Sequence, residues 1–183
     1  ANDPAGIGRV PKYAKVYVEN DDAGNPEMVV LPIQGYGLWG TIYGFLTLES
    51  DMNTIKGISF YEHKETPGLG ARIEEPEWRA QWSGIHSYDE NGAVATGVTK
   101  AGNPKENWVD GISGATLTGR GVSNMIQFWL SEQGYKPYLD ALREESGATI
   151  DNADAQASQA NLEQAKPTTE PAAALPLATG KEA

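Results

Sequence analysis

Residues 110–118 read Asp110-Gly111-Ile112-Ser113-Gly114-Ala115-Thr116-Leu117-Thr118, a polar segment broken by glycine. It leads directly into the clearest helical pattern of the chain, in which one helix face carries Val122, Met125, Ile126, Trp129 and Leu130. The sequence therefore predicts a helix start here, with the hydroxyl of Ser113, Thr116 or Thr118 as its N-cap. The unpaired N–H groups and dipole of such a helix end also suit a phosphate, so a simple cap and a phosphate site both fit.

The segments before this helix alternate apolar and polar residues, as strands do. We expect strands at 15–19, 28–33, 41–48, 55–63 and 93–100, with turns at 21–26 and 51–53. A short helix is predicted over 76–82, with Trp78 and Trp82 in the core. Gly134 should end the amphipathic helix, and 137–143 should form a last short helix. This order predicts an α+β fold, with a mostly antiparallel sheet packed against helices.

Composition divides the chain near residue 147. A length of 183 residues suits one compact domain, which we place at 1–147. The segment 148–183 is of low complexity, rich in Ala, Gln, Pro, Thr and Glu, and it has no aromatic residue. Such a segment buries too little apolar surface to offset its conformational entropy, so we predict a disordered or loosely helical tail.

Charge and residue usage exclude several classes of function. The net charge of −11 disfavours nucleic-acid binding, because phosphate backbones require a basic face. The chain has no cysteine, which excludes disulfides and thiolate chemistry, and His63 and His86 are too far apart for a local metal motif. The first residues lack the basic start and the apolar core of a signal peptide, and no apolar run reaches membrane-spanning length, so we expect membrane attachment through a segment absent from this chain.

The segment Asp110–Thr116 resembles the recognition sequence of flavin transferases, which move the FMN half of FAD onto its last threonine. It is found in the C subunit of the sodium-translocating NADH:quinone reductase (NqrC) and in the G subunit of the related Rnf complex. Further motifs that resemble the NqrC family cover roughly 10–145; they lie at 35–39, 61–70, 108–111, 128–130 and 134–139. The resemblance implies a single FMN-binding domain.

This resemblance also implies a role for individual residues. Thr116 matches the threonine that carries FMN through a phosphoester. Asp110 and Gly111 match the part read by the transferase, and Asp110 is a candidate Mg²⁺ ligand during transfer. The turn near the phosphate matches Ser113, Gly114, Ala115, Leu117 and Thr118. The ring of the flavin is expected beside Glu65, Thr66 and Leu69, with Trp39 as a further ring contact.

Alternatives to these roles come from the residues themselves. The loop 65–70 alone is typical of a proline-glycine turn, and Trp39 fits core packing as well as ring packing. We interpret His63 as a structural histidine at a strand end. A segment with the spacing Gly-x-Gly-x-x-Gly starts at Gly35, but no helix is expected after it, so we predict no NADH site in this domain.

The resemblance implies an electron-transfer flavoprotein domain of a bacterial inner-membrane complex that passes electrons from NADH to ubiquinone and exports sodium. The expected partners are the other subunits of that complex and the flavin transferase, with FAD as donor and Mg²⁺. The domain would face the extracytoplasmic, periplasmic side. An Rnf-type protein and a non-enzymatic, flavin-binding sensory module are the alternatives.

Overall fold

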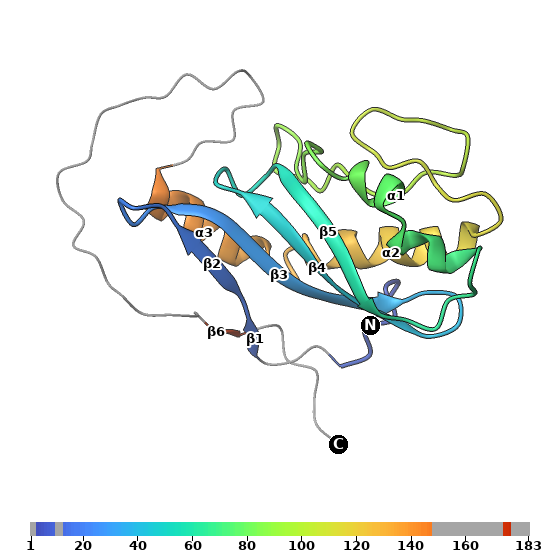
Figure 1. Cartoon of the computed structure of the whole chain (residues 1–183). Coiled ribbons are helices and arrows are strands. Elements are labelled where there is room, and N and C mark those ends of the chain that lie inside the picture. The colour runs from blue at the N-terminus through green and yellow to red at the C-terminus, as the bar shows by residue number, and fades with distance from the viewer. Residues whose placement is uncertain (1–2, 10–12, 148–173, 177–183) are drawn as a thin grey trace.

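The computed structural model describes residues 3–9, 13–147 and 174–176 (Figure 1). Its centre is an antiparallel sheet in the order β2-β3-β4-β5, formed by β2 (Tyr17–Asn20), β3 (Pro26–Tyr36), β4 (Thr41–Glu49) and β5 (Ile55–Glu62). The helices are η1 (Gly70–Glu74, a 3-10 helix), α1 (Pro76–Ala80), α2 (Thr116–Trp129) and α3 (Lys136–Ser146). The predicted α+β fold with an antiparallel sheet is therefore confirmed.

Each long strand has one buried and one half-exposed face, as period-two alternation requires. On β3 the buried side chains are Val29, Leu31 and Ile33, and the same face of the sheet continues through β4 and β5. The predicted strands at 28–33, 41–48 and 55–63 are confirmed. The one predicted at 15–19 is divided between β1 (Tyr13–Lys15), which pairs with β6 (Ala174–Pro176), and β2, which pairs with β3.

Helix α2 lies along the buried face of the sheet, next to β3 (Figure 1). At Gly35 the two backbones approach so closely that an added Cβ would lie 2.6 Å from the Cβ of Met125. The Trp129 Nε1–H donates to the carbonyl of Gln34 at 2.7 Å and thereby fixes the end of the helix on the strand. These contacts determine where the other end of α2, at Thr116, is placed.

The ends of α1, α2 and α3 differ from the predicted bounds by a few residues. Pro76 begins α1, as predicted, and the rings of Trp78 and Trp82 are buried and meet edge to face, with centroids 6.0 Å apart. Helix α2 ends at Trp129, before Gly134. Helix α3 extends beyond 137–143 and stops at Gly147, which adopts the left-handed conformation with φ 68°.

The strand predicted at 93–100 is wrong, because this segment makes only isolated bridges, from Val94 to Tyr88 and from Val98 to Val109. The Val98 N–H donates to the hydroxyl of Ser123 on α2 rather than to a neighbouring strand. The segment is therefore held by α2 and by backbone hydrogen bonds to Ser87 and Val109, and not by the sheet.

Most of the predicted tail, 148–173 and 177–183, lies outside the described residues. Its three described residues form β6 (Ala174–Pro176), which pairs antiparallel with β1. Within the part of the chain that the structure describes, no helix is long and apolar enough to cross a membrane.

Candidate functional site

Helix α2 begins at Thr116, and its N-cap is Ala115. The predicted hydroxyl cap is wrong: the N-cap side chain is a methyl group, which makes no cap hydrogen bond. The first helical bond runs from the Gly119 N–H to the carbonyl of Ala115 at 2.9 Å, so the N–H groups of the first turn point out of the helix end. Thr116 is the first residue of this 14-residue helix, so its hydroxyl lies at the positive end of the helix dipole. Thr116 is also exposed.

The turn before the helix requires glycine at position 114. Gly114 has φ 80°, a conformation that residues with a Cβ rarely adopt, and the Ala115 N–H closes the turn on the carbonyl of Ile112 at 3.0 Å. An added Cβ at Gly114 would lie 3.1 Å from Cδ2 of Leu69. The loop 65–70 is therefore in direct contact with the turn that precedes Thr116.

Four apolar side chains that belong to three different segments are exposed around this helix end. Leu38 and Trp39 lie between β3 and β4, Leu69 lies before η1, and Leu117 follows Thr116; their exposed fractions are 39%, 61%, 45% and 53%. The Trp39 Nε1–H donates to the hydroxyl of Thr66 at 3.1 Å, which holds the indole beside the loop 65–70. Exposed apolar groups beside an exposed helix N-terminus can accept a ligand that has a flat ring and a phosphate.

Two of the predicted contacts, Glu65 and Thr118, are buried, with 5% and 1% of their surface exposed. The Thr118 hydroxyl donates to the Glu65 carboxylate across 53 positions of sequence. Thr118 therefore lies behind the helix end, whereas Ser113 and Thr116 are at the surface.

Asp110 is held by α1 and by the loop before it. The Trp78 Nε1–H donates to the Asp110 carbonyl at 2.9 Å, and the Asp110 N–H donates to Oε1 of Gln81 at 3.0 Å. The carboxylate of Asp110 accepts from the Gly102 N–H at 3.0 Å. A cavity of about 370 Å³ adjoins these groups and is lined by Asp110, Gly111, Ser113, Arg72 and residues of α1.

Gly111 has no room for a side chain, because an added Cβ would lie 2.4 Å from the carbonyl oxygen of Thr99. The close packing of Gly111 explains a glycine at this position without a ligand. The Trp78 and Gln81 contacts were not predicted, because a side chain that bonds to a backbone 29 or 32 positions away leaves no local pattern.

His63 is in the structural position predicted for it. Its Nδ1 accepts from the Glu65 N–H at 3.1 Å, and its Nε2 lies 3.2 Å from Oε1 of Glu74. Among the described residues, no group of three or more His, Asp or Glu side chains could hold a metal ion.

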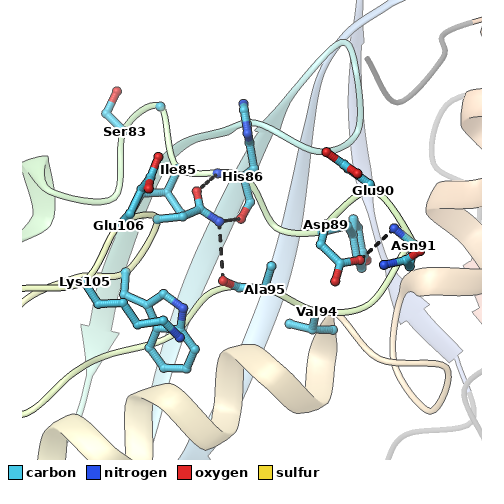
Figure 2. Close-up of a pocket in the computed structure, with 14 residues that line it drawn as sticks. Ser83, Ile85, His86, Asp89, Glu90, Asn91, Val94, Ala95, Lys105 and Glu106 are labelled. Carbon is cyan, nitrogen blue, oxygen red and sulfur yellow. Dashed lines mark hydrogen bonds between the residues drawn. The ribbon is translucent and has the colours of Figure 1, made fainter. Parts of the chain in front are cut away.

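A larger cavity of about 1010 Å³ lies between the loops 83–95 and 105–108 (Figure 2). The Asn107 side chain joins these loops: it accepts from the His86 N–H at 2.7 Å and donates to the His86 carbonyl at 2.8 Å. The Lys105 ammonium lies 3.9 Å from the centre of the Trp108 ring. This cavity shares no residue with the helix end, so we place the candidate site at Thr116 despite the difference in volume.

The sequence profile of FMN-binding domains matches residues 37–131, which include the whole helix end and the loop 65–70. The chain belongs to the FMN-binding domain family. This domain is 44% identical over 148 residues to the C subunit of the Na(+)-translocating NADH-quinone reductase of Pseudomonas aeruginosa, covering 78% of this chain and 56% of that protein. The C subunit of the same reductase from Vibrio parahaemolyticus is 46% identical over 145 residues. This match covers 78% of this chain and 55% of that protein.

Solved structures support the same assignment of this FMN-binding domain. The crystal structure of NqrC from Shewanella oneidensis superposes with a TM-score of 0.73 at 39% identity, covering 78% of this chain and 67% of that one. The crystal structure of the C subunit from Parabacteroides distasonis gives a TM-score of 0.60 at 38% identity, over 68% and 61% of the chains. The resemblance to NqrC is confirmed, and the chain spans about half the length of the curated relatives it matches.

Proposed function

We propose that this domain is an electron-transfer flavoprotein domain that carries one FMN, attached by a phosphoester to the hydroxyl of Thr116. The observation that carries the proposal is the exposed Thr116 hydroxyl at the start of α2, inside a segment that resembles a flavin-transferase recognition sequence. Membership of the FMN-binding domain family supports the identity of the ligand.

The residues fit such a group. Gly114 adopts the φ of 80° that the turn before Thr116 requires, and the N–H groups of the first helical turn point outward, where a phosphate would lie. Ser113, Ala115 and Leu117 complete the turn on the phosphate side. Leu69, Thr66 and Trp39 form the side on which a flat, apolar ring would lie. A bound flavin supplies one-electron and two-electron redox chemistry, which no side chain of this site can supply.

Attachment is a group transfer without oxidation or reduction. The Thr116 Oγ forms a new bond to the phosphorus of the FMN half of FAD, the pyrophosphate bond of FAD breaks, AMP leaves, and the hydroxyl proton is released. A threonine hydroxyl needs a base to react in this way, and Glu65, the carboxylate of the loop 65–70, is buried and bonded to Thr118 instead. A separate flavin transferase, with Mg²⁺, would therefore supply the catalysis, and Asp110 and Gly111 would be read by it.

The wider role follows from the relatives. We propose that the domain belongs to a sodium-translocating NADH:quinone reductase of the bacterial inner membrane, with ubiquinone as acceptor, and that its partners are the other subunits. It would face the extracytoplasmic, periplasmic side and attach to the membrane through a segment outside this sequence. The hairpin at Gly35–Gly40 leads from β3 into β4 without a helix, so this segment is not a dinucleotide-binding turn despite its glycine spacing.

Co-expression with a flavin transferase tests the proposal. The intact mass should rise by one FMN less one water, and the denatured band should fluoresce on a gel. Thr116→Ala should lose both signals and keep its melting temperature, because Thr116 is exposed. Ser83→Ala, at an exposed hydroxyl outside the segment 110–118, is the control and should retain the added mass. An unmodified wild-type protein in the presence of an active transferase would refute the covalent attachment.

A further inference from the structure

Glu65 is a buried carboxylate at the centre of the candidate site. Only 5% of the surface of Glu65 is exposed, although the neighbouring residues Lys64 and Thr66 are both exposed. Burying a carboxylate costs free energy unless hydrogen bonds replace its water, so its partners identify what it does.

The two oxygens of Glu65 bind two different parts of the site. Oε1 accepts from the N–H groups of Leu38 and Trp39, both at 3.0 Å. Oε2 accepts from the hydroxyl of Thr118, in the first turn of α2. One carboxylate therefore joins the β3–β4 hairpin, the loop 65–70 and the helix that carries Thr116.

Glycines on both sides make room for this carboxylate. An added Cβ at Gly37 would lie 2.5 Å from Oε1, and one at Gly70 would lie 2.8 Å from Oε2. The carboxylate is thus enclosed between Gly37 and Gly70, and a side chain at either position would collide with it.

We infer that Glu65 is a positioning residue that sets the separation between the Leu38-Trp39 backbone and α2, and that it does not itself contact the ligand. This inference rests on the proposed function, in which the flavin ring would lie against the hairpin and the flavin phosphate would be attached to the helix. The separation between hairpin and helix would then set the position of the ring relative to Thr116. It replaces the expectation that Glu65 supplies a polar contact to the ring.

Glu65→Gln and Glu65→Asp separate positioning from charge. A glutamine has the same length: its Oε1 can accept both N–H bonds and its Nε2–H₂ can donate to Thr118. An aspartate keeps the charge but is one methylene shorter, so it cannot reach both the hairpin and α2. Positioning therefore predicts that the neutral, isosteric variant resembles the wild type and the charged, shorter one does not.

The readout is amide hydrogen exchange of Leu38 and Trp39, measured by NMR on the full chain without flavin. Glu65→Asp should accelerate exchange at both amides at least about tenfold, whereas Glu65→Gln should accelerate it about fivefold or less. Thr118→Val should also accelerate hydrogen exchange at both amides, because it removes the hydrogen bond between α2 and the Glu65 carboxylate. Wild-type exchange rates in Glu65→Asp together with faster exchange in Glu65→Gln would overturn the inference.

A second measurement uses the chain loaded by the transferase. Glu65→Gln should carry FMN at wild-type mass and keep the midpoint potential of the flavin, whereas a carboxylate in contact with the ring would change that potential when neutralised. A potential that changes in Glu65→Gln while both amides exchange as in the wild type would also overturn the inference. Absence of FMN mass on the wild type would refute the proposed function alone, since the exchange pattern is measured without flavin.

Discussion

Arg143 is a buried cation that joins α3 to the turn between β4 and β5. Its residue exposure is 7%, and its guanidinium donates to the carbonyls of Asp51 and Met52, both at 3.1 Å, and to Asp140 at 2.9 Å. Met52 has a positive φ of 56°, so these bonds hold a turn that a non-glycine residue rarely adopts.

We predict that Arg143→Ala lowers the free energy of unfolding by about 2–3 kcal/mol, because it leaves two carbonyls of the turn without their donor. Urea denaturation followed by circular dichroism measures the change. Glu144→Ala, at an exposed neighbour on the same helix, is the control and should change stability by less than about 0.5 kcal/mol. Equal effects of the two substitutions would contradict this role of Arg143.

Single residues also show how far the sequence alone predicts the site. The start of the helix near Thr116 follows from a local pattern, and α2 does begin at Thr116. Thr118, two positions later, was grouped with the phosphate turn, but its hydroxyl is bonded to Glu65, 53 positions away. A pattern within one segment cannot reveal a partner on another, so the buried pair was missed.

At the scale of elements, the packing of α2 against the β3–β4 hairpin depends on Gly121. An added Cβ there would lie 2.4 Å from the carbonyl oxygen of Tyr36, whereas at Gly119 it would meet only Cγ1 of Val98 at 3.4 Å. Both glycines are inside the same helix, where alanine is intrinsically better by up to about 1 kcal/mol.

We therefore predict opposite effects for the two substitutions. Gly121→Ala should destabilise the domain by about 1–3 kcal/mol, because backbone atoms cannot move aside as a side chain can. Gly119→Ala should be neutral or stabilising. Thermal unfolding of both variants checks the prediction, and a stable Gly121→Ala protein would show that α2 does not pack on the hairpin as described.

Elements were predictable where local sequence decides them. Strands β4 and β5 follow from alternation, and their predicted bounds are correct to within one residue, whereas β3 is longer than the predicted 28–33 at both ends. The segment 93–100 has similar residues, but its backbone bonds to Ser87 and Val109 in loops and to the hydroxyl of Ser123 on α2, rather than to a strand of the sheet. Partners of this kind, in loops and on a helix, take the place of a neighbouring strand, and a local pattern cannot reveal them.

For the whole molecule, stability should fall at alkaline pH. Burial raises the pKa of both Tyr88 and Tyr135 above the ordinary value of 10.0, and the hydrogen bond to Asp140 raises the pKa of Lys136 above 10.5. Because these groups hold their protons more tightly in the folded state, their contribution is complete below about pH 10 and is lost as the pH rises through the folded pKa.

Melting temperatures between pH 7 and pH 12 measure this loss, which should begin near pH 10. Tyr135→Phe removes one of the titrating groups, and the slope of stability against pH should decrease by up to about 1.4 kcal/mol per pH unit. It also removes the bond from the Tyr135 hydroxyl to the Pro32 carbonyl, so the variant should be less stable at neutral pH. Stability that rises between pH 10 and pH 12 would contradict these shifts.

The central claim is that Thr116, and no other hydroxyl of its segment, carries the flavin. Trypsin should release residues 106–120 as one peptide, between Lys105 and Arg120, and this peptide contains Ser113, Thr116 and Thr118. Fragmentation of the peptide from protein co-expressed with the transferase gives the position of the added mass. The account predicts FMN less one water on Thr116 alone; the same mass on Ser113 or Thr118, or an unmodified peptide, would contradict it.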